Sequence, residues 1–239
     1  KELGGMLTLG IPAFRLEKDV LNAEIDILRE MGVEFRCGVD VGKDVTIAQL
    51  REQGYEAFYL AAGAWKSAPL GCTGDDKAGV WGGIEFLKAV NAGEEVMLGK
   101  NVAVIGGGNT AMDVARAAKR IPGVEHVRLI YRRTKRYMPA DEEELQLAIE
   151  DGVEFLELLA PVGAENGKLK CSVMELGAPD ASGRRSPVDT GRTEEYPADT
   201  IIAAIGETID TSLYAELGVE MDAKGRPVVD ANMMTTEAG

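Results

Sequence analysis

Apolar side chains recur at helical spacing early in the chain. They predict a helix over residues 19–31 that packs on a sheet and ends at Gly32. Residues 33–39, VEFRCGV, and residues 55–64, YEAFYLAAGA, are predicted strands. A connection rich in proline and glycine then leads to a second short helix that ends near residues 91–93. The apolar positions of the first helix are Val20, Leu21, Ile25, Ile27, Leu28 and Met31, and those of the second are Ile84, Leu87 and Val90.

The second half of the chain repeats parts of this order, with an addition at its start. Residues 102–105 form an apolar strand, residues 106–108 are three glycines, and a helix begins at Asn109. The strand VRLIY at 127–131 follows, and a helix that ends at Gly152 starts with four acidic residues, which the helix dipole favours there.

Two matches in the same order indicate related α/β units. GVEFLEL at 152–158 corresponds to GVEFRCG at 32–38, and each copy ends on an apolar strand with small residues, at 58–64 and at 200–207. The second copy has an opening strand and a glycine loop, whereas the first has neither before residue 19. The first unit is therefore expected to lack its opening part.

In the second unit, a longer polar stretch lies between the GVEFLEL segment and the closing apolar strand. Asn166 and Gly167 form a good turn dipeptide, and Leu169, Cys171 and Val173 alternate with polar residues as in a strand with one buried face. We predict an inserted β-hairpin or three-stranded meander. The predicted fold is α/β, with a Rossmann-like parallel sheet, covering helices and this antiparallel insertion.

The glycine loop carries the clearest chemical signal. Its pattern is G-x-G-x-x-A: Gly106 permits a tight turn, Gly108 lets the backbone approach a pyrophosphate, and Ala111 lets helix and strand pack closely. The N–H groups at the start of the helix and the helix dipole then attract phosphate. A glycine turn with only a structural role is the alternative. The predicted phosphate-binding residues are Gly106, Gly107, Gly108, Asn109, Thr110 and Ala111.

The residues after the next strand distinguish between cofactors. An NAD site usually has Asp or Glu about 20 residues beyond the loop, but this chain has Arg132 and Arg133. Arginine presents a fixed fork of donors that suits phosphate, so the pair favours the 2′-phosphate of NADP. A solvated basic loop is the simpler alternative.

Composition narrows the possible functions. The 239 residues carry a formal net charge of −14, which argues against general nucleic-acid binding. Three cysteines without a CxxC argue against a metal cluster or a redox dithiol, and His126 is the only histidine. No catalytic residue or metal ligand is therefore predicted. No apolar run suggests a membrane span and no signal peptide is recognisable, so a cytoplasmic location is expected.

Four motifs in order resemble the small (beta) subunit family of NADPH-dependent glutamate synthase. They are also similar to the FAD/NADPH half of dihydropyrimidine dehydrogenase and to selenate reductase subunits. The motifs are GGMLTLGIPAFRL at 4–16, VIGGGNTAMD at 104–113, YRRTKRYMPA at 131–140 and AAIGETID at 203–210.

The resemblance implies a flavoprotein oxidoreductase that takes hydride from NADPH onto FAD. Electrons then pass through iron-sulfur clusters, outside this chain, to a partner subunit or domain such as a glutamate synthase-like large subunit. It also implies that Ala204, Ile205 and Gly206 lie near the nicotinamide and that residues 10–16 lie toward the flavin. The chemistry of such enzymes belongs to their cofactors, so a catalytic base is not required.

The same resemblance predicts the domain boundaries. Residues 1–66 are expected to be part of an FAD-binding domain without its opening glycine loop, residues 67–207 an NADPH-binding domain with its core at 99–207, and residues 208–239 a truncated return segment. On this basis the chain is expected to be a fragment that binds NADPH but retains FAD poorly and is inactive alone. A non-catalytic nucleotide-binding or regulatory module is the alternative from a different class. A disulfide reductase is disfavoured because no cysteine pair is present.

Overall fold

A five-stranded parallel sheet forms the centre of the computed structural model, which describes residues 2–77, 79–181 and 183–237. Its strand order is β2-β9-β3-β4-β5. Parallel strands need crossover connections, and helices provide them between β3, β4 and β5, as predicted for an α/β fold. The strands and helices are β2 (Val80–Gly82), α4 (Gly83–Asn91), β3 (Asn101–Ile105), α5 (Asn109–Lys119), β4 (His126–Tyr131), the 3-10 helix η1 (Lys135–Tyr137), α6 (Glu142–Glu150), β5 (Glu154–Glu157) and β9 (Thr200–Ala203).

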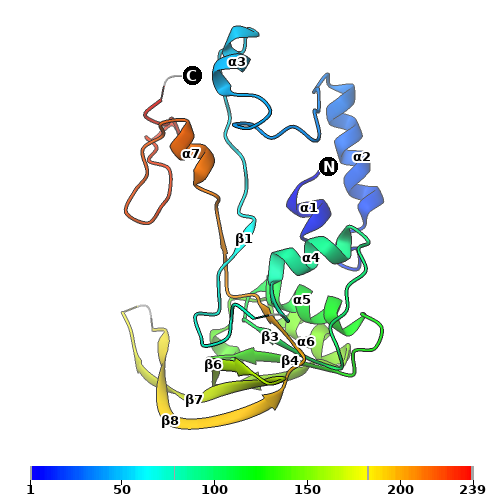
Figure 1. The fold of residues 1–239 in the computed structure, drawn as a ribbon, viewed down its shortest axis with the longest axis vertical. Coiled ribbons are helices and arrows are strands. Elements are labelled where there is room, and N and C mark those ends of the chain that lie inside the picture. Colours follow the sequence, from blue (N-terminus) through cyan, green and yellow to red (C-terminus); the bar gives the residue numbers. More distant parts are fainter. Residues whose placement is uncertain (1, 78, 182, 238–239) are drawn as a thin grey trace.

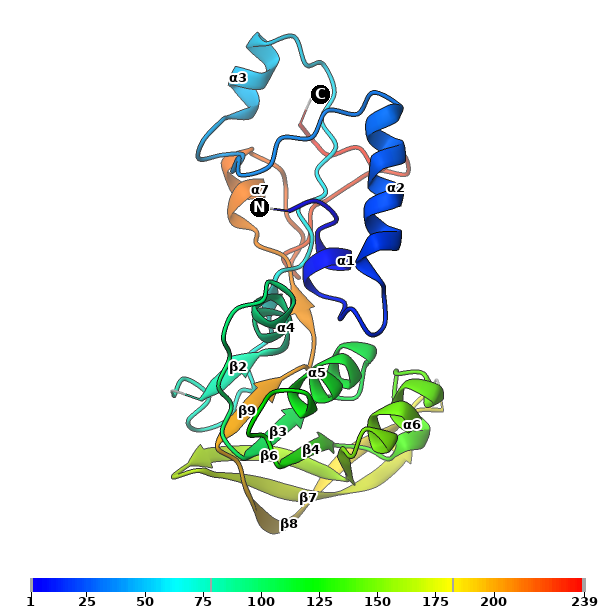
Figure 2. The ribbon, with the colours of Figure 1, turned by 90° about the vertical axis from the view of Figure 1, so that its right-hand side faces the viewer.

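Both faces of this sheet are covered. Side chains alternate along β3, so Val102 and Val104 pack with α4, α5 and α6, while Ala103 and Ile105 pack against the antiparallel meander on the opposite face. Figure 2 shows the three layers, with the helices above the sheet and the long strands of the meander below it. Burial on both faces explains why β3 and β9 are apolar at nearly every position.

The predicted insertion is a three-stranded antiparallel meander. It consists of β6 (Leu159–Glu165), β7 (Lys168–Pro179) and β8 (Arg185–Pro197), in that spatial order. Asn166 and Gly167 form the first turn with φ values of 52° and 69°, a left-handed conformation that asparagine and glycine tolerate well. Leu169 and Cys171 are fully buried against the sheet, which confirms the predicted apolar face.

A two-stranded antiparallel ribbon joins the sheet and meander to the rest of the chain. Its strands are β1 (Lys66–Ser67) and β10 (Glu207–Thr208), and Lys66 pairs with Thr208. We call residues 66–208 the sandwich, and residues 2–65 and 209–237 the outer segments. The helices of the outer segments are α1 (Met6–Leu9), α2 (Lys18–Glu30), α3 (Ile47–Glu52) and α7 (Ser212–Glu216).

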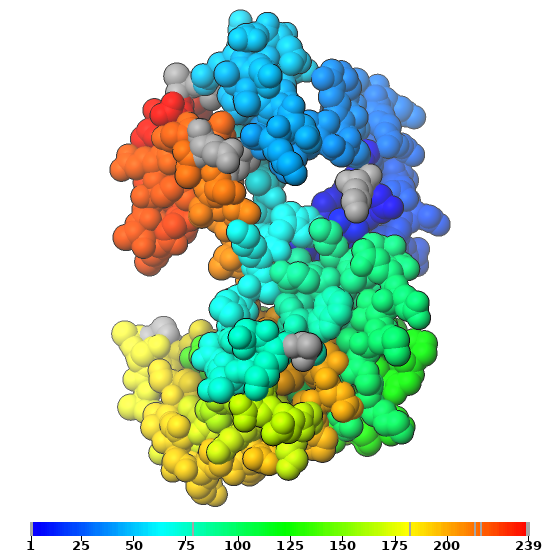
Figure 3. Space-filling view, viewed as in Figure 1, coloured from blue at the N-terminus to red at the C-terminus, as the bar shows by residue number. Residues whose placement is uncertain are grey.

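The outer segments stand above the sandwich, and the chain crosses between the two parts at the ribbon (Figure 1). In Figure 3 a notch separates the orange α7 segment from the yellow β7–β8 hairpin below it. No helix in the described part of the chain combines the length and apolarity that a bilayer crossing requires.

Three predictions for the outer segments were wrong. Residues 33–39 and 55–64 are not strands, and no backbone hydrogen bond joins residues 56–64 to any other described residue. A β-strand forms only when its backbone N–H and C=O groups make hydrogen bonds with a neighbouring strand. None of the described residues makes such bonds with residues 56–64. Helix α2 forms as predicted, but it contacts α1 instead of a sheet, and Val20, Ile27 and Met31 are exposed.

Candidate nucleotide site

A cleft of about 480 Å³ lies at the carboxyl ends of β3, β4 and β9. In open parallel sheets this edge is where ligands bind, because loops and helix N-termini converge there. The glycine loop forms one part of its wall and the meander forms another. The lining residues are Leu70, Ile105, Gly106, Gly107, Gly108, Thr110, Ile130, Tyr131, Arg132, Arg133, Pro139, Leu159, Ala160, Pro161, Arg184, Ala204, Ile205, Gly206 and Glu207.

The three glycines of the loop have different roles. A Cβ atom on Gly106 would lie 2.1 Å from the carbonyl oxygen of Ala204, and one on Gly107 would lie 2.4 Å from the ring of Tyr131. Gly106 also has a φ of 155°, which side chains rarely permit. A Cβ atom on Gly108 would meet only Pro139, at 4.0 Å. The first two glycines therefore allow close packing, whereas the backbone of Gly108 stays open to the cleft.

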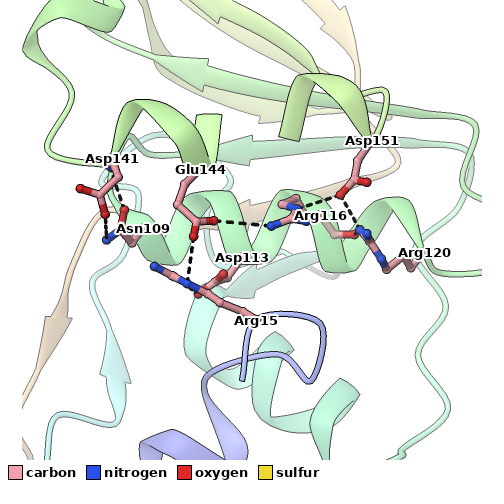
Figure 4. A network of polar contacts seen from close by, with 8 residues as sticks. All are labelled: Arg15, Asn109, Asp113, Arg116, Arg120, Asp141, Glu144 and Asp151. Atoms are coloured by element: carbon pink, nitrogen blue, oxygen red, sulfur yellow. Dashed lines mark hydrogen bonds and ion pairs between the residues drawn. The ribbon is translucent and has the colours of Figure 1, made fainter. Parts of the chain in front are cut away.

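Helix α5 presents an uncapped N-terminus at this wall. Its N-cap is Gly108, and no side chain caps the first N–H groups. The side chain of Asn109 turns instead toward α6, where it exchanges hydrogen bonds with the side chain and backbone N–H of Asp141 at 3.2 and 3.1 Å (Figure 4). The free N–H groups and the helix dipole therefore favour an anion from the cleft.

Guanidinium groups line the other side of the cleft. Arg132 is exposed and makes no hydrogen bond or ion pair with the described residues. Arg133 is half-buried, and its Nε donates to the backbone oxygen of Arg185 at 3.1 Å, which ties β4 to the meander. Arg184, from the turn between β7 and β8, lines the same cleft. Among the lining residues, the one with a carboxylate side chain is Glu207.

The third edge of the cleft comes from the end of β9. Its position is fixed by two backbone hydrogen bonds, from Ala204 N–H to Ile105 at 2.8 Å and from Ala68 N–H to Gly206 at 2.9 Å. The side chain of Ile205 is 46% exposed at this edge. An apolar side chain and small residues here provide a surface for a flat ring.

The structure brings most of the predicted site residues together. Gly106, Gly107, Gly108, Thr110, Arg132, Arg133, Ala204, Ile205 and Gly206 all line the cleft. Ala111 is fully buried beneath the loop, and Asn109 is bonded to Asp141, so neither lines it. Sequence reasoning missed Arg184 and Tyr131. The signal for Arg184 was the basic pair Arg184 and Arg185 inside an otherwise polar loop.

An ion-pair network that sequence reasoning also missed joins α5 and α6 to the segment before α2. Nη1 of Arg15 is 2.8 Å from Oδ2 of Asp113, and Nε of Arg15 is 3.2 Å from Glu144 (Figure 4). Burial raises the pKa of Asp113, although Arg15 opposes the shift. Oδ1 of Asp113 has no hydrogen-bond partner among the described residues. Arg15 is therefore the main compensation for a buried carboxylate.

The network continues along α5 and holds an aromatic side chain. Arg116 and Arg120 both bind Asp151, at 2.8 and 2.7 Å, and the hydrogen bond from Arg120 lowers the Asp151 pKa. Their guanidinium carbons lie 4.6 and 4.4 Å from the ring centroid of Phe14. Cation–π contacts of this kind attach the segment before α2 to the helix layer.

A second cavity of about 560 Å³ lies in the outer segments. Apolar residues from four separate stretches line most of it, among them Ile47 of α3, Phe58 and Leu60, Tyr214 of α7 and Met233. Although this cavity is larger, it lacks the uncapped helix N-terminus and the three arginines of the cleft in the sandwich. The cleft in the sandwich is therefore the better nucleotide site.

Comparison with known proteins identifies the family to which these features belong. The family model described as pyridine nucleotide-disulphide oxidoreductase matches residues 15–239. YgfK of Escherichia coli strain K12, a candidate oxidoreductase, is 43% identical over 230 residues, which are 96% of this chain and 22% of the relative. The NADPH glutamate synthase small chain of the same organism is 39% identical over 244 residues, which cover 94% of this chain and 51% of the relative.

A solved structure has the same fold. FprA of Mycobacterium tuberculosis, in complex with NADPH, superposes with a TM-score of 0.77 at 19% sequence identity, and the match covers 98% of this chain and 67% of FprA. The chain spans about a fifth to a half of the length of the two curated relatives described above. The predicted fold class and family resemblance are both confirmed.

Proposed function

Because this chain belongs to the pyridine nucleotide-disulphide oxidoreductase family, we propose that the cleft in the sandwich binds NADPH for a flavin-dependent oxidoreductase. The observation that carries the proposal is the pairing of an uncapped helix N-terminus with arginines across one cleft. A dinucleotide has negative charge at its pyrophosphate, and NADPH has a further phosphate on its adenosine ribose. The two walls match these two charges.

Each wall has a distinct part in this proposal. The backbone at Gly108 and the N-terminal N–H groups of α5 bind the pyrophosphate, and Gly106, Gly107 and Ala111 keep the loop close to the sheet. Arg132 and Arg133 bind the 2′-phosphate. Ala204, Ile205 and Gly206 lie beside the nicotinamide, where the protein orients the ring and excludes water while the hydride chemistry belongs to the cofactor.

We further propose that residues 1–66 and 208–239 are parts of an FAD-binding unit, and that residues 67–207 form the NADPH-binding unit with its core at 99–207. The pairing of β1 with β10 supports this division, because the chain enters and leaves the sandwich at these two strands. The described residues of the outer segments contain no second glycine loop between a strand and a helix, so they do not provide a complete cradle for a dinucleotide. We therefore assign no FAD contact to any residue.

Relatives suggest how electrons leave the intact protein. One relative is the small chain of a glutamate synthase, a name that implies a companion chain. We propose that the protein works in passing electrons from NADPH through FAD to iron-sulfur clusters on such a partner. A chain of 239 residues without FAD would bind NADPH without oxidising it.

Nucleotide affinity tests the proposal. Calorimetric titration of the 239-residue chain should show tighter binding of NADPH than of NADH, and the double variant Arg132→Ala/Arg133→Ala should lose that preference. Arg192→Ala is the matched control, because Arg192 is an exposed arginine on β8 that does not line the cleft. Equal losses for the two nucleotides in the double variant contradict the assignment. Purification of the chain with stoichiometric FAD would contradict the proposed weak retention of flavin.

A further inference from the structure

We propose that Arg184, supplied by the meander, is a third arginine for the 2′-phosphate and sets the preference for NADPH over NADH. This inference rests on the proposed function, because it requires a nucleotide in the cleft. It assigns a role in specificity to the inserted meander, which lies outside the strand–loop–helix unit that binds the pyrophosphate. Arg184 is 52 positions beyond Arg132 in the sequence, yet both residues line the same cleft.

Backbone contacts fix the meander beside the basic end of β4. Nε of Arg133 donates to the backbone oxygen of Arg185 at 3.1 Å, directly after Arg184 in the chain. A second connection joins the base of the meander, where the N–H of Leu158 donates to the Arg133 oxygen at 3.3 Å. Arg133 is therefore bonded through its side chain to the residue after Arg184 and through its backbone to the residue before β6, and these bonds hold the meander beside the end of β4.

Of the two adjacent arginines in the turn, one is committed to the meander itself. Nε and Nη2 of Arg185 donate to the backbone oxygens of Gly177 and Leu176, at 2.6 and 3.0 Å. Arg184 is held only by its backbone, whose N–H donates to Oδ1 of Asp180 at 3.0 Å. Its guanidinium makes no hydrogen bond or ion pair with the described residues. The turn therefore positions Arg184 while leaving its donors available to a ligand.

The charge of the cleft supports a ligand with an additional phosphate. The chain as a whole has a net charge of −14, but three arginines and one carboxylate, Glu207, line this cleft. Glu207 follows Gly206, at the edge that we assign to the nicotinamide, and one carboxylate leaves the cleft with an excess of positive charge. Arginine forks bind phosphate oxygens in pairs, and several forks together distinguish a phosphate from a hydroxyl.

Two pairs of nucleotides isolate the contribution of Arg184. NADPH and NADH differ by the 2′-phosphate, and so do 2′,5′-ADP and 5′-AMP, which lack a nicotinamide. We expect Arg184→Ala to weaken binding of NADPH and of 2′,5′-ADP by roughly five- to tenfold, as for an exposed hydrogen bond between charged groups. Binding of NADH and 5′-AMP should change by less than about twofold, because the pyrophosphate wall is untouched.

Two further variants complete the experiment. Arg184→Lys keeps the positive charge but loses the fork, so it should restore only part of the affinity for 2′,5′-ADP. Arg192→Ala, on the same strand pair but outside the cleft, should match the unmodified chain for all four nucleotides. Titrations at low and high salt add a second readout. The difference between 2′,5′-ADP and 5′-AMP should shrink at high salt, and it should shrink more in the unmodified chain than in Arg184→Ala, which keeps only Arg132 and Arg133 at the 2′-phosphate.

The outcomes separate this inference from the proposed function. If Arg184→Ala behaves like Arg192→Ala while Arg132→Ala/Arg133→Ala loses the preference for NADPH, the inference is wrong and the proposed function stands. If Arg184→Ala weakens all four nucleotides equally, Arg184 supports the shape of the meander and the inference is again wrong. If the unmodified chain binds NADPH and NADH equally, both are wrong.

Discussion

Arg15 and Asp113 form an ion pair of 2.8 Å although 98 positions separate them in the sequence. The carboxylate is almost fully buried in α5, and its second oxygen has no partner among the described residues. The pair joins an outer segment to the helix that begins at the candidate pyrophosphate site. The ion pair therefore compensates for the buried charge of Asp113, and it also attaches an outer segment to the sandwich.

Removing Arg15 should destabilise the sandwich. In Arg15→Ala the free energy of unfolding should fall by about 2–3 kcal/mol at pH 7, because a buried charge loses its partner. The exposed pair of Arg29 and Asp26 provides a control, and Arg29→Ala should change stability by less than about 0.5 kcal/mol. Urea unfolding followed by tryptophan fluorescence measures both, and equal effects would contradict the role of Arg15.

The same variant should have a distinct pH dependence. Burial already raises the pKa of Asp113, and loss of Arg15, which lowers it, should raise that pKa further. A carboxyl group with a raised pKa in the folded state loses stability as pH rises from its unfolded value of about 4 through its folded value. Arg15→Ala should therefore be less destabilised at pH 5 than at pH 7. Adding Asp113→Asn should remove this difference.

Two glycines of the loop should respond differently to alanine. Gly106→Ala should destabilise the fold by about 2 kcal/mol or more, because its Cβ would overlap the Ala204 carbonyl in a strained backbone conformation. Gly108→Ala should fold normally, since its Cβ would meet only Pro139 at an ordinary contact distance of 4.0 Å, but it should weaken nucleotide binding where the pyrophosphate approaches. Thermal unfolding and calorimetric titration separate the two effects. A Gly108→Ala protein with unchanged affinity would contradict the placement of the pyrophosphate.

The three cysteine thiols should react more slowly the more deeply they are buried. Burial raises the pKa of Cys171 to about 12 and also raises the pKa of Cys72, whereas Cys37 is exposed. Only the thiolate reacts, so a disulfide reagent at pH 8 should modify Cys37 first and Cys171 only after unfolding. Cys37→Ser should remove the fast phase. A fast phase that persists in this variant would place a reactive thiol elsewhere in the chain.

Asp199 should stabilise the start of β3 in a manner that depends on pH. Its Oδ2 accepts hydrogen bonds from the N–H groups of Lys100 and Asn101, at 3.0 and 2.8 Å, and these bonds lower its pKa. A carboxyl group with a lowered pKa contributes stability above its unfolded value of about 4, and this contribution is lost as pH falls through the folded value. Asp199→Ala should cost about 1–2 kcal/mol at pH 7. The cost should decline below pH 4, and a constant cost would exclude the charged hydrogen bonds as its source.

Local signals explain the elements that the sequence predicted correctly. The run from residue 101 to residue 131 contains a strand, a glycine turn, a helix and a strand, and each is specified by its own apolar pattern. The meander was predictable because Asn166 and Gly167 favour a turn between alternating strands. In both regions the residues that pair with each other are close together in the chain.

Long-range relationships explain the errors and omissions. Residues 55–64 have the apolar pattern of a strand, but a strand also requires neighbours, which no local pattern reveals. Arg184 reaches the cleft only because the meander returns toward β4, and Arg15 reaches Asp113 only in the folded chain. Sequence patterns predicted most of the residues that line the candidate nucleotide site, whereas contacts between distant segments required the structure.

The pairing of Lys66 with Thr208 has a consequence for how this protein is assembled from modules. The chain enters and leaves the sandwich through neighbouring strands, so both ends of that unit meet at one point. A host protein accepts an inserted cassette most readily when the ends of the cassette are adjacent. Exchanging the sandwich for another module would therefore require a match at one pair of strands, at the contact of α1 with α4 and at the surface around Phe14 and Arg15.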